Sequence, residues 1–491
     1  MAFASELEAS LREFSALGMV ELRENGGRPA ALEGLSWEIR GTPEQPLLHI
    51  WSDSFNVTRR VLAITDHSEQ RLALSVERFG RLKPDRLEFV RKDFQRQARE
   101  VSRQEFCERL RGVLAQQFPD ESVDSLVTGE DLEHSLPGNY ARGILHRGSA
   151  YSAVLGVGPG ESSDTLAKSL AYGLLWIERV RGMSGVRGLV DGLRLILPAN
   201  SARSVAHFCG ALGRNLRVQL FELDAHTDEL HEIDAPLAGN VNSWLVPHRE
   251  FQALLDRAHA ALAPIVALAP HGITLHPGQG AIVLRFRGLP FACWDDGQLF
   301  LQTRDARKLV SGDARRVLEP WLRELELHRN PLASETRHPL YRAQPERWLE
   351  ALVREDVTRI DAALDPRFVY AQVFAEAGGE HAILDVLGVT RSGRLAIIEL
   401  KASEHIHLPL QAADYWLRIR RHLQQDDFQR NGYFPGVVLQ STPPLVYLVA
   451  PALRFHPTTG VLLKYLANDL DVVRIGLAES WRRGLRVVMR Q

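Results

Sequence analysis

The stretch HAILDVLGVTRSGRLAIIELKASEHIHLPLQAADYW, residues 381–416, decides the fold of the last third of the chain. Two apolar runs flank the turn TRSG, a pattern that predicts a β-hairpin. Asp385 and Glu399 are equally distant from Ser392, at the centre of this turn. They should therefore lie nearly opposite each other, within carboxylate reach of one ion. Lys401 is two residues beyond Glu399 on a strand and should share its face.

These residue types suit the hydrolysis of a phosphodiester. Two carboxylates attract Mg²⁺, a hard ion that keeps several waters, and the bound ion polarises the phosphate and lowers the pKa of its water. A lysine beside that water can orient it and offset the developing negative charge. Glu399 and Lys401 stand in an otherwise apolar strand, where they are costly unless they meet an ion, a partner or solvent. Gln411 and Tyr415, four residues apart on the expected following helix, share a face.

Taken in order, these features resemble the PD-(D/E)XK superfamily, the restriction-endonuclease-like nucleases, over roughly residues 340–480. Asp385 matches the family's aspartate, Glu399 and Lys401 match its ExK tripeptide, and Gln411 to Tyr415 matches the QxxxY helix of one large branch. An ExK or a QxxxY alone is weakly specific, and the resemblance depends on finding all of them in this order. The alternative is a cross-strand salt bridge on a mixed sheet.

The resemblance extends to an acidic residue of the first helix. Glu350, in ERWLEALV, matches that residue, with Glu355 as a second candidate. Leu384 stands where the family loosely keeps a proline. The resemblance implies an αβββαβ core, cleavage of nucleic acid, and Mg²⁺ or Mn²⁺ as the cofactor. It also implies a metal site formed by Asp385 and Glu399, with Glu350 completing it through a water.

The pattern of strands and helices predicts a mixed α/β (α+β) chain of three domains. Residues 1–130 should form a small N-terminal α+β domain of unknown role, in which a helix from about Lys92 to Phe118 follows a small antiparallel sheet. Residues 131–325 should form a middle α/β domain, and residues 326–491 the nuclease-like domain.

The middle and last domains have a similar order of elements. The strand and helix that begin at 151 correspond to those that begin at 395, and strand 193–199 corresponds to 445–452. We therefore expect an old duplication whose first copy is an inactive nuclease-like domain, with chance α/β similarity as the alternative.

Composition limits the class of protein. With 491 residues, 45% hydrophobic and 24% charged, the chain can bury several cores. Its net charge of −2 lacks the excess of basic residues typical of proteins that coat nucleic acid, so any positive field must be local. The start does not resemble a signal peptide, the three cysteines are far apart, and no stretch has the length of a membrane span. These features predict a cytoplasmic protein with reduced thiols.

Three further candidates are weaker. His405 and His407 follow the ExK strand and could line the cleft, although polar residues often end a strand. Arg418 shares a helix face with Tyr415 and could contact a phosphate or solvent. The Gly-rich turn at 156–169 could hold an anion at a helix N-terminus, but it lacks the glycine and lysine pattern of a P-loop.

The first functional hypothesis is therefore a Mg²⁺-dependent endonuclease, with DNA favoured over RNA as its substrate. Asp385 and Glu399 hold the metal, Lys401 positions the water, and Gln411 and Tyr415 orient the substrate or the lysine. Nucleases of this family often dimerise, so a homodimer is compatible with the resemblance. The alternatives are a catalytically silent nucleic-acid-binding protein on the same fold, and a nucleotide-responsive regulator built on the middle domain.

Overall fold

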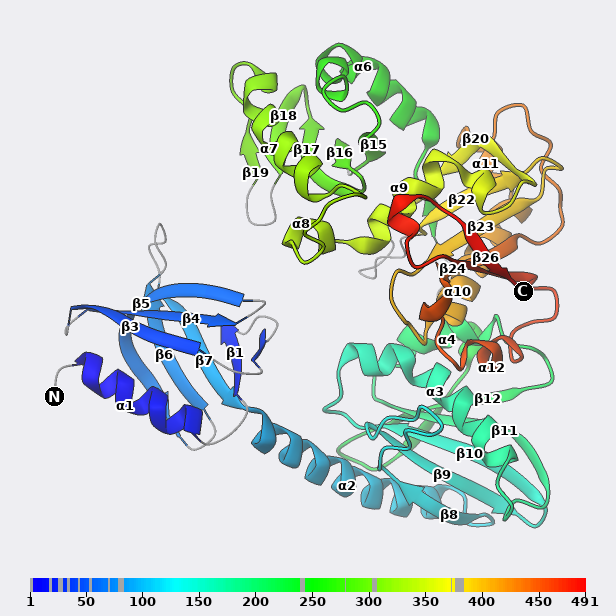
Figure 1. Ribbon diagram of the computed structural model, residues 1–491. Helices are drawn as coiled ribbons and strands as arrows, with labels where there is room; N and C mark the ends of the chain where they lie inside the picture. Colours follow the sequence, from blue (N-terminus) through cyan, green and yellow to red (C-terminus); the bar gives the residue numbers. More distant parts are fainter. Residues whose placement is uncertain are drawn as a thin grey trace. The chain divides into compact units, whose positions relative to one another are not determined.

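The computed structural model describes residues 3–16, 20–24, 30–32, 36–42, 45–52, 55–68, 71–77, 84–238, 243–278, 280–302, 307–371, 373–375 and 384–491. Figure 1 shows the elements along the chain. The fold is mixed α/β, which confirms the expected fold class. The chain divides into two compact units, Met1–Arg109 and Leu110–Gln491. No described helix combines the length and the apolar character needed to cross a membrane.

The first unit is an antiparallel sheet covered by an amphipathic helix. Leu7 and Leu11, one helical turn apart, are fully buried in its core together with apolar residues from the strands. The sheet order is β2-β1-β7-β6-β5-β4-β3. The bounds are α1 (Phe3–Ala16), β1 (Val20–Glu24), β2 (Ala30–Leu32), β3 (Ser36–Thr42), β4 (Gln45–Ser52), β5 (Phe55–His67), β6 (Arg71–Glu77) and β7 (Asp85–Arg91). The expected helix after the sheet is α2 (Lys92–Gln117).

The second unit begins with a six-stranded sheet of order β13-β12-β11-β10-β9-β8. Strands β8 to β10 pair antiparallel, β10 to β12 pair parallel, and β13 is antiparallel to β12. The parallel strands are apolar along most of their length, as strands buried on both faces are. The bounds are β8 (Ser122–Val127), β9 (Tyr140–Arg147), β10 (Ala150–Val157), α3 (Ser163–Arg181), β11 (Leu189–Pro198), α4 (Arg203–Cys209), β12 (Arg217–Leu223), β13 (Leu230–Ile233) and α5 (Ala235–Ala238).

A second six-stranded sheet, formed by the last third of the chain, has the order β20-β22-β23-β24-β25-β26. Here too the first three strands pair antiparallel, the next pairs are parallel, and the last is antiparallel. The bounds are α9 (Pro345–Glu355), β20 (Leu364–Tyr370), β22 (Val386–Thr390), β23 (Leu395–Leu400), α10 (Leu408–Gln424), α11 (Asp427–Arg430), β24 (Leu445–Pro451), α12 (Thr459–Leu463), β25 (Val472–Leu477) and β26 (Val487–Arg490).

The two sheets therefore have the same strand order and the same strand directions. Helices α3, α4, α10 and α12 lie between them (Figure 1), and one hydrophobic core runs through all four helices. Two loops meet at an isolated antiparallel bridge between Leu212 and Leu466. Gly213 N donates to Tyr465 O at 2.8 Å, and Ala467 N donates to Ala211 O at 2.9 Å.

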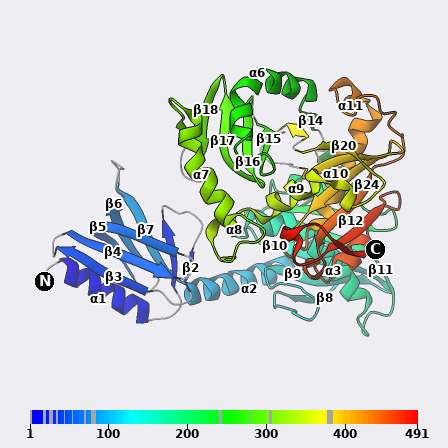
Figure 2. The same cartoon turned by 45° about the horizontal axis from the view of Figure 1, so that its top comes forward.

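A third sheet is a five-stranded antiparallel meander of order β15-β16-β17-β18-β19. Helices α6 and α7 share its hydrophobic core, and Figure 2 shows α6 and α7 beside these strands. Residues 131–325, expected to form one α/β domain, thus supply strands to two sheets with different cores. The bounds are β14 (Trp244–Leu245), α6 (His248–Val266), β15 (Ile273–Pro277), β16 (Ile282–Phe286), β17 (Leu289–Asp295), β18 (Gln298–Gln302), β19 (Arg307–Leu309), α7 (Ala314–His328), α8 (Pro339–Arg342) and β21 (Phe374–Ala375), which pairs with β14.

Candidate metal and active site

The hairpin β22–β23 brings the two predicted carboxylates together. Val386 pairs with Ile398 at the end of the ladder, and one more step of this register places Asp385 opposite Glu399. The backbone N–H of Leu400 donates to Asp385 Oδ2 at 3.0 Å, which ties Asp385 to the end of β23. The Nζ of Lys401 donates to Glu399 Oε1 at 3.0 Å. The lysine therefore lies beside the acid pair.

Burial makes this pair electrostatically costly. Burial raises the pKa of Asp385 to about 6, although the charge of Lys401 and the Leu400 N–H act in the opposite direction. Burial and then the charge of Asp385 raise the pKa of Glu399 well above its usual range, against the charge and hydrogen bond of Lys401. Burial lowers the pKa of Lys401, but the charges of Glu399, Asp385 and Glu346 outweigh it, so its pKa is raised. Lys401 thus stays an ammonium group at neutral pH.

One oxygen of the pair has no hydrogen-bond partner. Glu399 is fully buried, and its Oε2 meets no donor among the described residues. A buried carboxylate oxygen without a donor is costly, and a divalent cation shared with Asp385 would satisfy it. No three His, Cys, Asp or Glu side chains in the described ranges are grouped to hold a metal ion. The protein therefore offers two carboxylates, which suits Mg²⁺, an ion that keeps several waters.

The helix predicted to carry the QxxxY pair is α10. Gln411 Nε2 donates to the hydroxyl of Tyr415 at 3.3 Å, so these two side chains are brought together. Burial, followed by the charge of Glu399, raises the pKa of Tyr415 well above its usual range. The tyrosine hydroxyl therefore stays protonated and lies close enough to the acid pair to respond to its charge.

The predicted acid of the first helix, Glu350, is buried among cations. Its Oε2 lies 2.5 Å from Arg347 Nη1, and its Oε1 lies 3.8 Å from Arg285 Nη1 and 4.0 Å from Arg354 Nη1. His276 Nδ1 lies 4.0 Å from the same Oε1. Arg285 and His276 belong to β16 and β15 of the third sheet.

Arg347 connects this ionic cluster to the acid pair. The same Nη1 atom that contacts Glu350 lies 3.8 Å from Asp385 Oδ1. The charge of Glu350 also acts to raise the pKa of Asp385, after the larger effect of burial. Glu350 is therefore near the acid pair, with the guanidinium of Arg347 beside both carboxylates.

Glu346, in the first turn of α9, is a further acid near the site that the sequence motifs did not single out. Its charge acts to raise the pKa of both Glu399 and Lys401, so it lies within electrostatic range of the acid pair. Residues four apart on a helix lie on one face, so the spacing between Glu346 and Glu350 could have shown that both acids belong to one stripe. Glu355 lies at the last position of the same helix.

The weaker candidates lie in other surroundings. Arg418 is buried and its Nε donates to Asp414 Oδ2 at 2.9 Å, within α10. Burial, followed by the charge of Lys401, lowers the pKa of His405 to about 4, and burial with the charge of His405 lowers that of His407 to about 3. Both rings are therefore neutral at neutral pH.

The Gly-rich turn opens α3 with its own cap. The Ser162 side chain accepts a hydrogen bond from Thr165 N at 3.2 Å. This serine occupies one of the backbone donors that an anion would use at a helix N-terminus. The structure therefore gives the turn an ordinary structural role in starting the helix.

Comparison with known proteins adds little to this geometry. No protein-family model matches the chain, and no curated protein matches it. Among solved structures, the crystal structure of a repair endonuclease from Pyrococcus abyssi is similar at 14% sequence identity and a TM-score of 0.17. The similarity covers 46% of this chain and 95% of that one. A similarity at this level carries no argument, so the assignment below depends on the site.

Proposed function

We propose that the chain is a metal-dependent nuclease that hydrolyses phosphodiester bonds, with DNA as its preferred substrate. The observation that carries this proposal is the fully buried Glu399, whose Oε2 has no donor among the described residues and which lies beside a second carboxylate and a lysine. Removing charges from water is expensive unless they are compensated. A protein that keeps two buried acids together gains most from them when they share a divalent cation.

Each residue of the proposed site has a separate role. Asp385 and Glu399 would hold Mg²⁺ or Mn²⁺, which when bound polarises the phosphate and acidifies a water. Lys401, held as an ammonium by its acidic neighbours, donates to the attacking water or to a phosphate oxygen and offsets negative charge in the transition state. Because it is protonated, it is not the general base. Gln411 and Tyr415, which are hydrogen-bonded to each other, would orient the substrate or the lysine.

We also propose that the six-stranded sheet β8–β13 is a silent copy of the nuclease-like sheet, which is formed by β20 and β22–β26. Strands β11 and β24 align at the prolines that end them, Pro198 and Pro451. Leu195 of β11 and Leu448 of β24 then occupy equivalent positions. Leu195 pairs with Leu155, and Leu448 pairs with Glu399. Leu155 therefore corresponds to Glu399 of the proposed active half. Val157 then replaces Lys401.

The aspartate position is also replaced in the first half. Leu155 pairs with Arg142 across β9–β10, so a buried arginine stands where the other hairpin has Asp385. An arginine cannot bind a metal cation, and it supplies a fixed positive charge instead. The Leu212–Leu466 bridge joins equivalent loops of the two halves, as a two-fold axis requires. On this proposal, one chain contains two nuclease-like halves and a single active site.

Plasmid cleavage tests the proposal. Supercoiled plasmid, linear DNA and RNA are incubated with Mg²⁺, Mn²⁺ or EDTA, using the wild type and Lys401→Ala. We expect ion-dependent cleavage that the variant lacks. Because each chain has one active site, nicked circles should accumulate before linear product. Binding of DNA without any product would favour the silent binding protein, and equal cleavage by both proteins would exclude the proposed site.

A further inference from the structure

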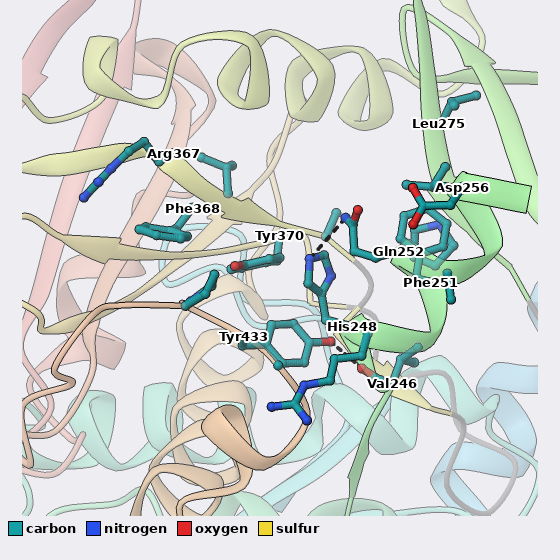
Figure 3. A pocket seen from close by; sticks show the side chains of 18 of the residues that line it. Val246, His248, Phe251, Gln252, Asp256, Leu275, Arg367, Phe368, Tyr370 and Tyr433 are labelled. Atoms are coloured by element: carbon teal, nitrogen blue, oxygen red, sulfur yellow. Dashed lines mark hydrogen bonds between the residues drawn. The ribbon is translucent and has the colours of Figure 1, made fainter. Parts of the chain in front are cut away.

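A cavity of about 750 Å³ lies between α6 and β15 on one side and β20 with the segment 432–435 on the other. This volume is in the range of small-molecule sites. Figure 3 shows its labelled side chains, which come from α6, from β20 and from the segments beside them. The cavity is separate from the acid pair described above.

Aromatic rings form one wall of the cavity. The ring centroid of Tyr370 lies 4.9 Å from that of His248 and 4.9 Å from that of Tyr433. The polar ends of both tyrosines are engaged elsewhere: the Tyr433 hydroxyl donates to Val246 O at 2.6 Å, and the Tyr370 hydroxyl accepts from Phe434 N at 3.1 Å. Burial lowers the pKa of His248, so its ring is neutral at neutral pH. Tyr433 is buried behind them, so the half-buried rings of Tyr370 and His248 supply the ring surface that a ligand can reach, and neither ring carries charge.

Two charged side chains of α6 line the same cavity. Arg249 and Asp256 are exposed, and neither has an ion pair with any residue that the structure describes. The stem of Arg249 packs against Gly432, where a Cβ atom would lie 2.4 Å from the Cγ of the arginine. This packing limits the conformations of the arginine and so reduces the entropy cost of binding.

We propose that this cavity binds a nucleoside phosphate. A base packs against the half-buried rings of Tyr370 and His248, and such stacking tolerates every base. Arg249 binds the phosphate through charge-assisted hydrogen bonds. Asp256 accepts hydrogen bonds from N–H groups of the base, which favours guanine, with two adjacent donors, over uracil. The ligand is either a free nucleotide or an unpaired nucleotide of a nucleic-acid strand.

The place of the cavity in the sheet is compatible with both sources. Tyr370 of β20 pairs with Leu387 of β22, and Leu387 lies two residues after Asp385. The cavity therefore lies along β20, and Asp385 immediately precedes the neighbouring strand β22. Arg354 also lines it and lies 4.0 Å from Glu350. A strand bound at the acid pair could place a neighbouring nucleotide here. The proposal does not depend on the nuclease activity.

Thermal unfolding of the full chain in EDTA tests the proposal, with guanosine monophosphate, uridine monophosphate, inorganic phosphate, a short unpaired oligonucleotide and a blunt duplex as probes. We expect guanosine monophosphate or the oligonucleotide to raise the unfolding midpoint. Arg249→Ala should weaken the affinity about tenfold, as expected for a hydrogen bond to a charged group. Asp256→Asn should remove the preference for guanine. Arg257→Ala, an exposed change on the same helix that does not line the cavity, should behave as the wild type.

The outcomes separate the two sources of ligand and the two proposals of function. Stronger binding of the oligonucleotide than of the mononucleotide identifies a strand, and the reverse identifies a free nucleotide. Glu399→Gln should bind guanosine monophosphate as the wild type does, so a chain without nuclease activity can still show the cavity to be a nucleotide site. The inference is overturned if no probe shifts the midpoint, or if Arg249→Ala responds as strongly as the wild type.

Discussion

Replacing Asp385 by asparagine should stabilise the metal-free protein at neutral pH. Asp385 has a raised pKa of about 6 in the fold, against an ordinary 3.8, so its ionised form is disfavoured by folding. A shift of about two pKa units, each worth about 1.4 kcal/mol, corresponds to a cost on the order of 3 kcal/mol. Asparagine removes the charge and keeps a side-chain oxygen for the Leu400 N–H.

The pH dependence has a definite sign. Between its ordinary pKa of 3.8 and its raised value of about 6, Asp385 binds more protons in the folded state than in the unfolded state. Stability should therefore fall as pH rises through this window and stay low above it. The gain from Asp385→Asn should be full above about pH 6 and should disappear below about pH 4, where both states are protonated.

Divalent cations should reverse the order of stability. An ion bound by Asp385 and Glu399 stabilises only the wild type, by about 4.1 kcal/mol at a concentration of about one thousand times its Kd, which exceeds the cost on the order of 3 kcal/mol. The assay is urea unfolding of both proteins with EDTA or Mn²⁺, near pH 7.5 and near pH 5. Asp365→Asn is the matched control, because the hydrogen bond and ion pair with Arg367 lower the pKa of Asp365 instead of raising it. Losing this ion pair should lower the free energy of unfolding by at most about 1 kcal/mol. A wild type more stable than Asp385→Asn in EDTA, or equal stabilisation of both by Mn²⁺, would refute the reasoning.

Three other changes test separate parts of the structure. Lys401→Ala should reduce the rate of single-turnover cleavage by about a hundredfold or more, while calorimetry still detects Mn²⁺ binding. If the variant loses both cleavage and Mn²⁺ binding, the role of Lys401 in the chemical step is contradicted. Glu346→Gln should lower the pKa of Glu399 and Lys401 and move the acidic limb of the pH–rate profile to lower pH; an unchanged profile would show that Glu346 does not act on the site. Trp416→Ala should lower the free energy of unfolding, measured in urea, by about 3–5 kcal/mol, because the indole is fully buried. Trp244→Ala, which changes an exposed tryptophan, should alter it by less than about 0.5 kcal/mol.

The part of the site that the sequence could predict is the part built from local geometry. Asp385, Glu399 and Lys401 lie within one hairpin, and a hairpin fixes which residues face each other once its turn is placed. Gln411 and Tyr415 likewise depend only on helical spacing. The role of these residues in metal binding and catalysis stays a prediction, but their proximity follows from short-range rules.

Contacts between distant segments set the limits of sequence reading. Arg418 was expected to face the substrate or solvent, yet it pairs with Asp414 inside the protein, because α10 is packed between two sheets rather than on one. The helix pattern alone could not show that the opposite face of α10 is also covered.

The surroundings of Glu350 show how a distant sheet can act on the active site. His276 and Arg285 come from β15 and β16, so the neutral ring of His276 and the charge of Arg285 beside Glu350 could not be read from the helix that carries it. Glu350 in turn holds Arg347, whose guanidinium also lies beside Asp385. If Glu350 is lost, Arg347 is no longer held and the buried cations lose their counter-charge, which should cost several kcal/mol. A Glu350→Gln variant that loses cleavage would therefore not identify a metal ligand unless it also folds stably and binds Mn²⁺ more weakly.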